Sequence, residues 1–240
     1  MQEGFVEVVK GYPYLFANIM SLALCLIASR ITPQGNMIIV SGLLNTPCFF
    51  LLAVPPWNEY WNPVRVGGWV LGVEDVLCSF DVGALAWLAA GAPFGLATSS
   101  RICHGGFFKR YAVLGSLTAG LFILLWLVGL DAMTSLIVTC FVVGAFLFVL
   151  RRDLRFLALS GLIGFPILYS LIVSFYFRIW PDFAFQWKTH NFWGRAILGL
   201  PAGEVAWAVV FGFFWPLFVG HVCDVRLTGR LHLFGFVRQK

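Results

Sequence analysis

The sequence predicts an all-α integral membrane protein. Hydrophobic residues make up 60% of the 240-residue chain, charged residues make up only 11%, and the mean hydropathy is +0.88. A soluble globular protein of this length needs a larger charged surface. The apolar runs continue for roughly 20 residues instead of alternating over roughly 10, which favours transmembrane helices over a β-barrel.

Seven apolar segments are long enough to be transmembrane helices. The second contains Asn45 and Pro47, and only Asp131 and Ala132 separate the fourth from the fifth. The first segment is expected to be retained, because its flank is not that of a signal peptide and no clear small-residue cleavage site follows it. The expected helices cover residues 12–29, 37–54, 69–97, 111–130, 133–150, 156–177 and 196–222.

An internal repeat organises these segments into a single membrane domain, residues 1–240. Ser41-Gly-Leu-Leu-Asn-Thr-Pro47 matches Ser160-Gly-Leu-Ile-Gly-Phe-Pro166, and each is followed by an aromatic-rich loop, a Trp, the dipeptide Leu-Gly and an acid-bearing helix. Because four crossings separate the copies, both begin on the same side of the membrane. We therefore expect two parallel three-helix units, about 12–98 and 133–224, joined by a connector helix at about 111–130, with any site between the units.

The loops 55–68 and 178–195 share one face of the expected topology. Aromatic residues are typical of segments that lie at a membrane interface, so both loops are expected on the outer surface. Their aromatic residues are Trp57, Tyr60, Trp61, Trp180, Phe183, Phe185, Trp187, Phe192 and Trp193.

Carboxyl groups inside the apolar segments mark the expected functional site. Glu204 lies near the start of the seventh segment, and Glu74, Asp75 and Asp81 lie in the third. Taking an ionised carboxylate out of water costs on the order of several kcal/mol, so such residues indicate function by default. Glu74 and Asp81 share a helical stripe with Cys78 and could face a common cleft.

Each acid also has a structural interpretation. Glu74 and Asp75 could complement the dipole at the start of their helix, in the headgroup region. Asp81 could pair with Asn45 or with an arginine. Glu204 could cap the helix that begins after a proline.

With these elements the chain resembles the lycopene cyclase domain family over about residues 12–224. In that family two three-helix units, separate or fused through a connecting helix, cyclise the ends of carotenoids. Its members typically carry Pro-x-Glu-Glu at the start of the third helix of each unit. Here the second unit has Pro201-Ala-Gly-Glu204, whereas the first has Ser79-Phe-Asp81-Val82. The Leu-Gly dipeptide leaves the register of the first unit ambiguous, so Glu74 could be the counterpart instead.

The resemblance implies cyclisation of a carotenoid or another isoprenoid polyene without a cofactor. Glu204 would protonate an alkene in a dry pocket, and Asp81 or Glu74 would collect the proton that the cyclised cation loses. Aromatic faces would stabilise the cation between these steps. The aromatic residues available on the two acid-bearing helices are Trp207, Phe211, Trp215, Phe80 and Trp87.

Other function classes have weaker support in the sequence. The four histidines lack the spacing of a metal site, and no glycine-rich phosphate loop occurs, so neither a metal nor a cofactor is expected. The basic balance is explained by membrane orientation and lipid attraction, without a nucleic-acid partner. The alternative to an enzyme is a non-catalytic scaffold, or a subunit that binds pigment or lipid beside other membrane proteins in a larger assembly.

The basic residues predict the orientation of the chain in a bacterial or archaeal cytoplasmic membrane. Cytoplasmic loops carry an excess of Lys and Arg, so the C-terminus should be cytoplasmic and the N-terminus outside. Separate tags on the two ends should report opposite sides, and both ends on one side would contradict the parallel repeat. The N-terminal face holds five basic residues (Lys10, Arg65, Arg178, Lys188 and Arg195) and the other face eleven (Arg30, Arg101, Lys109, Arg110, Arg151, Arg152, Arg155, Arg226, Arg230, Arg238 and Lys240).

Overall fold

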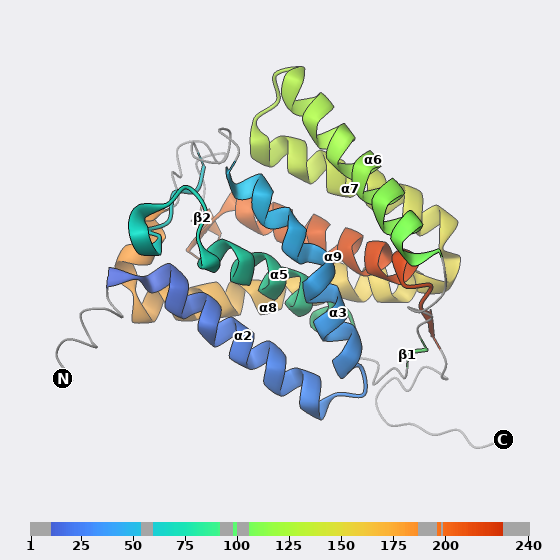
Figure 1. Cartoon of the computed structure of the whole chain (residues 1–240), viewed down its shortest axis with the longest axis horizontal. Coiled ribbons are helices and arrows are strands. Elements are labelled where there is room, and N and C mark those ends of the chain that lie inside the picture. Colours follow the sequence, from blue (N-terminus) through green and yellow to red (C-terminus); the bar gives the residue numbers. More distant parts are fainter. Residues whose placement is uncertain are drawn as a thin grey trace.

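The computed structural model describes residues 11–53, 60–91, 98–99, 106–186, 196–197 and 199–227. In this part the protein is a bundle of helices with a few two-residue strands (Figure 1). The α-helices are α2 (Pro13–Ile31), α3 (Gly35–Asn45), α5 (Val73–Gly91), α6 (Phe107–Leu127), α7 (Ala132–Leu150), α8 (Arg155–Ile179) and α9 (Ala202–Val222).

Long apolar helices confirm the prediction of an all-α multi-pass membrane protein. Five helices in the described residues are long and apolar enough to cross a bilayer: α2, α6, α7, α8 with the 3₁₀ turn η4 (Arg152–Leu154) before it, and α9. The fourth and fifth expected segments are separate helices, as predicted. Gly129 supplies a positive φ of 96° in the turn between them, and the side chain of Asp131 accepts a hydrogen bond of 2.9 Å from the backbone nitrogen of Thr134.

The second expected helix changes type at its middle. The α-helix α3 ends at Asn45, and the chain continues as the 3₁₀ helix η1 (Thr46–Ala53). Pro47 has no backbone N–H to continue the α-helical hydrogen bonds, and it disfavours the α conformation of the residue before it. Pro166, at the matching position of the repeat, lies inside the continuous helix α8.

The third and seventh helices begin later than expected. Helix α5 starts at Val73, after the 3₁₀ turn η2 (Val66–Gly68), so Trp69 lies before the helix. Helix α9 starts at Ala202, after a hairpin of β2 (Ala196–Ile197) and β3 (Leu200–Pro201) that turns at Gly199 with a φ of 86°. The residues before both helices are as apolar as the helices themselves, so hydropathy predicts starts that are too early.

Helices α5 and α9 occupy the centre of the bundle. Helix α5 packs against α2, α3, α8 and α9, whereas α9 packs against α6, α7, α8 and α5. Two loops meet at one end, where the backbone nitrogen of Asn62 donates to the carbonyl oxygen of Gln186 at 3.1 Å. At the other end β1 (Thr98–Ser99) pairs with β4 (Arg226–Leu227). The acid-bearing helices therefore run in the same direction (Figure 1).

The aromatic residues of the two loops differ in their surroundings. Trp61 forms edge contacts with Tyr14 and Phe183, at ring distances of 5.5 and 5.8 Å, so these rings pack between the loops and helix α2. Tyr60, Trp61, Trp180 and Phe183 are buried, and Phe185 is exposed. Aromatic composition alone does not separate an interfacial ring from a packed one.

Some residues used in the predictions lie outside the described residues. They are the loop aromatics Trp57, Trp187, Phe192 and Trp193 and the basic residues Lys10, Arg101, Lys188, Arg195, Arg230, Arg238 and Lys240 that predict the orientation.

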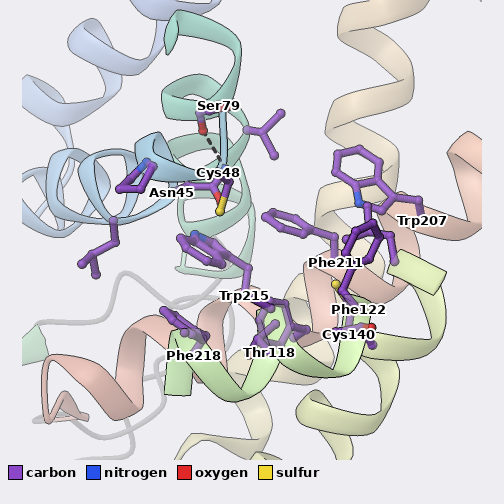
Figure 2. Close-up of a pocket in the computed structure, with 18 of the residues that line it drawn as sticks. Asn45, Cys48, Ser79, Thr118, Phe122, Cys140, Trp207, Phe211, Trp215 and Phe218 are labelled. Atoms are coloured by element: carbon purple, nitrogen blue, oxygen red, sulfur yellow. Dashed lines mark hydrogen bonds between the residues drawn. The ribbon is translucent and has the colours of Figure 1, made fainter. Parts of the chain in front are cut away.

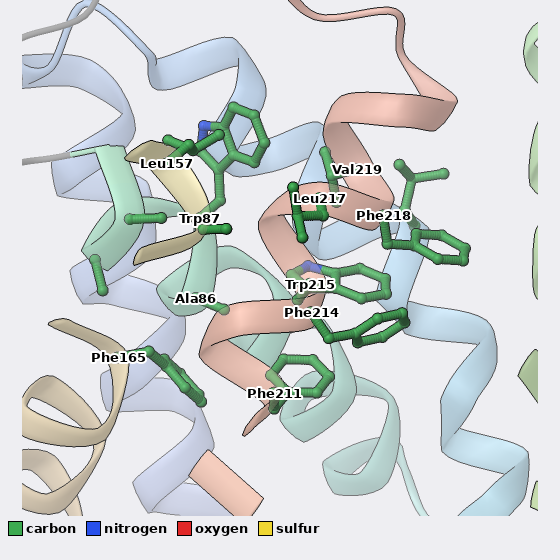
Figure 3. Packing of buried hydrophobic residues seen from close by; sticks show 14 of the residues in the cluster. Ala86, Trp87, Leu157, Phe165, Phe211, Phe214, Trp215, Leu217, Phe218 and Val219 are labelled. Carbon is green, nitrogen blue, oxygen red and sulfur yellow. The ribbon is translucent and has the colours of Figure 1, made fainter. Parts of the chain in front are cut away.

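Glycines let the central helices approach their neighbours. A Cβ on Gly212 of α9 would collide with the carbonyl oxygen of Gly161 in α8. A Cβ on Gly83 of α5 would lie 2.8 Å from the carbonyl oxygen of Ser41 in α3. Small residues of this kind allow close helix packing in membranes, where dispersion contacts replace the hydrophobic effect as the attraction between helices. Around them the core contains Trp87, Phe165, Phe211, Phe214, Trp215 and Phe218 (Figure 3).

The substitution Gly161→Ala should destabilise the bundle by about 1–3 kcal/mol, because the added methyl group meets the backbone of α9 and the helices must move apart. Thermal unfolding of the purified protein in detergent would measure the change. Gly120→Ala in α6 is the matched control, since a Cβ there meets nothing within 4 Å. Equal stability of the two variants would show that the helices tolerate the wider spacing.

Candidate functional site

A cavity of about 550 Å³ lies beside helix α9 (Figure 2). Its walls come from α9, from α6 and α7, from the end of α3 with η1, and from the face of α5 that carries Cys78, Ser79 and Val82. Apolar and aromatic side chains provide most of the wall, and Glu204 contributes its carboxyl group. Predominantly apolar walls with a few polar groups are typical of sites for small hydrophobic ligands.

Glu204 is the third residue of α9, directly after the β2–β3 hairpin. Only 5% of its surface is exposed. The hydroxyl group of Tyr169, on α8, donates a hydrogen bond to Oε1 of Glu204. Oε2 has no hydrogen-bond partner among the described residues. One carboxyl oxygen is thus fixed by the protein while the other remains available.

The aromatic residues predicted on α9 line this cavity. Trp207, Phe211, Trp215 and Phe218 follow each other at spacings of four, four and three residues and so share one helix face. Neighbouring rings are 5.2, 5.4 and 5.1 Å apart, and the last two pairs stack at 10°. The row starts one turn after Glu204 and extends along the wall.

Hydrogen bonds hold Trp215 in this row. Its Nε1 donates to the hydroxyl oxygen of Ser41 at 2.8 Å, and that hydroxyl group donates to the carbonyl oxygen of Gly83 at 2.7 Å. The Ser-Gly element of α3 therefore connects α9 with α5. In contrast, Nε1 of Trp207 and Oγ1 of Thr139, which also line the cavity, have no hydrogen-bond partner among the described residues. These atoms and Oε2 of Glu204 could bind the polar groups of a ligand.

The other aromatic residues predicted for the site, Phe80 and Trp87, are not part of the cavity wall. The ring of Phe80 packs on Gly42 of α3, where a Cβ would lie 2.5 Å from it. Trp87 is fully buried in the core. Both residues pack helices together.

Glu74 begins helix α5 and does not line the cavity. Its Oε1 accepts a hydrogen bond of 2.6 Å from the backbone nitrogen of Val66, whereas Oε2 has no partner among the described residues. Glu74 thus binds the backbone of the loop before its helix. This contact with the loop differs from the helix-dipole interaction that the sequence suggests for Glu74.

Asp81 is buried in the middle of α5 and also lies outside the cavity wall. Neither carboxyl oxygen has a hydrogen-bond partner among the described residues. The amide of Asn45, the suggested partner of Asp81, donates instead to the carbonyl oxygen of Ser79 at 2.7 Å. Of the stripe predicted to face one cleft, only Cys78 reaches the cavity.

Asp75 lies at the centre of a buried polar network. Its carboxylate forms a bidentate ion pair with Arg65, at 2.7 and 3.1 Å, and accepts a hydrogen bond of 3.1 Å from the hydroxyl group of Tyr14. It also accepts a bond of 2.7 Å from the backbone nitrogen of Gly72, which is the returning half of a capping box. Asp75 therefore ties α2 and the preceding loop to the start of α5.

Asp75 and Glu204 occupy equivalent positions, because each is the third residue of its helix. The packing supports this alignment: Gly83 and Gly212 are each the eleventh helical residue and each meets the Ser-Gly element of its own unit. In the predicted repeat the counterpart of Glu204 would then be Asp75, which is not one of the predicted catalytic residues. Each acid precedes its packed glycine, Gly83 or Gly212, by eight residues, and this spacing could have indicated the alignment. No such spacing indicates Tyr169 as the partner of Glu204.

Within the described residues, no three His, Cys, Asp or Glu side chains gather in a way that could hold a metal ion. Comparison with protein-family models, with curated proteins and with solved structures finds no match to this chain.

The two equivalent acids should differ sharply in their effect on stability. Asp75→Asn leaves the buried guanidinium group of Arg65 without its counter-charge, so we expect a loss of about 3–5 kcal/mol. Glu204→Gln keeps a group that can accept the hydrogen bond from Tyr169, so its loss should stay within about 1 kcal/mol. Thermal unfolding in detergent would compare them. A Glu204→Gln variant as unstable as Asp75→Asn would make Glu204 a structural residue.

Proposed function

We propose that this protein cyclises the end of a carotenoid or another isoprenoid polyene, with Glu204 as the acid. The observation that carries the proposal is the Glu204 carboxyl group, which lies in the wall of a large apolar cavity and has one oxygen without a hydrogen-bond partner among the described residues. A polyene offers no group for strong polar recognition, so its site must be apolar and aromatic apart from the acid.

Several features support the membrane arrangement that the proposal requires. We propose seven transmembrane helices in two parallel three-helix units, with α6 as the connector. Helix α5 and the continuous pair α3 and η1 would be the two crossings beyond the five long apolar helices. At about 1.5 Å per α-helical and 2.0 Å per 3₁₀ residue, each reaches roughly 30 Å, the thickness of a hydrocarbon core. The equivalent acids and glycines of α5 and α9 favour the repeat.

The proposed reaction needs no oxidant and no cofactor. Glu204 donates its proton to a carbon of the terminal alkene, which leaves a tertiary carbocation. The electron pair of the next alkene forms the ring bond and moves the positive charge to an adjacent carbon. Loss of a proton from a neighbouring carbon then restores a double bond. Atoms are conserved, so the product is an isomer of the substrate.

Three features of the cavity would support these reaction steps. Glu204 is buried and has no cationic partner among the described residues, which suits the neutral acid that a proton donor must be. Tyr169 orients the carboxyl group through Oε1. The faces of Trp207 and Phe211, the rings of the row nearest to Glu204, would stabilise the cation by about 0.5–2 kcal/mol each.

For the acceptor of the final proton, the geometry favours Glu204 itself. The first step converts Glu204 into a carboxylate, and Glu204 is the one acidic residue among the described residues of the cavity wall. Asp81 and Glu74, the predicted acceptors, do not line that wall. Asp75 is held as an ion by Arg65 and is proposed to be structural.

The alternative function is a scaffold or a subunit that binds pigment or lipid without converting it. The position of α6 favours this alternative, because only Leu114 and Phe122 of that helix are buried. Its outer surface is large and apolar, so another membrane protein could pack there. The same cavity would then hold a polyene in an assembly.

Glu204→Gln should lower product formation at least about 100-fold while the protein remains folded and inserted, because the amide keeps the shape of the side chain but donates no acidic proton. Pigment analysis of a lycopene-accumulating host that expresses each variant would measure this. Glu74→Gln and Asp81→Asn are the matched controls, and both should keep more activity than Glu204→Gln. A comparable loss in one of them would identify it as the acceptor.

The wild-type protein itself distinguishes the enzyme from the scaffold. A cyclase should convert lycopene after purification, without added flavin or metal. If no polyene is converted under any of these conditions, and the protein co-purifies with stoichiometric membrane-protein partners, the enzyme proposal is wrong and the scaffold stands.

A further inference from the structure

A second pocket lies at the far end of helix α9 from Glu204. It has a volume of about 710 Å³, and polar side chains dominate its wall. The residues come from the starts and ends of α6, α7 and α9 and from the short strand β4. They are Arg110, Leu150, Arg151, Asp153, His221, Asp224 and Arg226.

One of the three arginines is fully engaged by the protein. Arg151 forms a bidentate ion pair with Asp153, at 2.9 and 2.7 Å. It also donates to the carbonyl oxygens of Gly220 and Val225, at 3.0 and 2.6 Å. Arg151 therefore neutralises Asp153 and fixes the end of α9, and it contributes little free charge to the pocket.

Two of the remaining basic side chains of the pocket wall have nitrogen atoms that bind nothing in the described residues. Arg110 is anchored by Nε, which donates to the carbonyl oxygen of Val222 at 3.0 Å. Its Nη2 is buried and has no hydrogen-bond partner among the described residues, and the same holds for Nδ1 of His221. Arg226 is exposed at the wall of the pocket. Asp224 is the other carboxylate of the wall besides Asp153, and its negative charge offsets part of the positive charge of the arginines.

We propose that this pocket binds a phosphate group of a lipid or of an isoprenoid. A buried guanidinium edge, a second guanidinium group and an imidazole supply several converging donors, which suits the oxygens of a phosphate. The carbonyl groups at the end of α9 would repel an anion, but those of Gly220 and Val222 already accept hydrogen bonds from Arg151 and Arg110. A metal cation is disfavoured by the three guanidinium groups.

Two sources could supply this phosphate. The predicted orientation places the pocket at the cytoplasmic surface, where the headgroups of anionic lipids lie. The pocket is also adjacent to the apolar cavity on two helices. On α6, Arg110 of the pocket precedes Tyr111 of the cavity wall, and on α9, His221 of the pocket lies one turn after Phe218 of the cavity wall. An isoprenoid diphosphate would therefore present its anionic end to the same donors. The proposal does not depend on cyclisation.

Binding to the purified full-length protein in neutral detergent separates these sources. One pair of probes is dihexanoyl phosphatidic acid and dihexanoyl glycerol, and the other is geranylgeranyl diphosphate and geranylgeraniol. We expect the phosphate-bearing member of at least one pair to bind at least about tenfold more tightly than its neutral partner, and added salt should weaken that preference. Preference in the first pair identifies a lipid headgroup, and preference in the second identifies an isoprenoid.

Variants test whether the pocket is the site. Arg226→Gln should weaken binding of the phosphate-bearing probe about tenfold or more, and Arg110→Gln should do the same. Arg226 is exposed in a short strand, so its replacement keeps the fold even if Arg110→Gln disturbs the end of α9. Lys109→Gln removes the same charge from an exposed neighbour and should leave binding unchanged. No preference for phosphate in either pair, or an equal loss in Lys109→Gln, would overturn the proposal.

Discussion

A carboxyl group buried in an apolar bundle must find a counter-charge or be neutral, and this constraint organises the structure. Two helices place an acid at their third residue, and each solves the problem differently. Asp75 binds Arg65, Tyr14 and the backbone of Gly72, so its charge is compensated on every side. Glu204 receives one hydrogen bond from Tyr169, and no cation of the described residues pairs with it. The first arrangement ties parts of the fold together, and the second suits the proposed role of Glu204 as a proton donor.

The packing of the two halves explains why only Glu204 borders a cavity. Helix α8 packs against both α5 and α9, and a Cβ on Gly164 of α8 would lie 2.8 Å from the carbonyl oxygen of Ala89 in α5. The matching residue of α3 is Asn45, whose larger side chain binds the carbonyl oxygen of Ser79 and lines the cavity. Helix α3 meets α9 through the hydrogen bond between Ser41 and Trp215. The space left between these helices is bounded on its outer side by α6.

Much of the fold could be predicted because its causes are local. Apolar length predicts helices, and a turn of Gly129 and Asp131 is enough to separate α6 from α7. The starts of α5 and α9 could not be predicted from hydropathy, since the residues before them are apolar too. They depend instead on Gly199 and Pro201 in one case and on the hydrogen bond between Gly72 and Asp75 in the other.

The role of each acid depends on residues distant in the sequence, which is why the site could be predicted only in part. Glu204 and the aromatic row beginning at Trp207 share one helix, so their common wall follows from helical spacing. Tyr169 comes from another helix, and no spacing rule connects it to Glu204. The position of Asp81 could not be predicted for the same reason. Its spacing from Glu74 on α5 predicted a shared cleft, but Asp81 does not line the cavity. The side of α5 that faces the cavity is set by how this helix packs against α8 and α2. A carboxyl group in an apolar segment therefore indicates a functional site, and the residues packed against it decide between catalysis and structure.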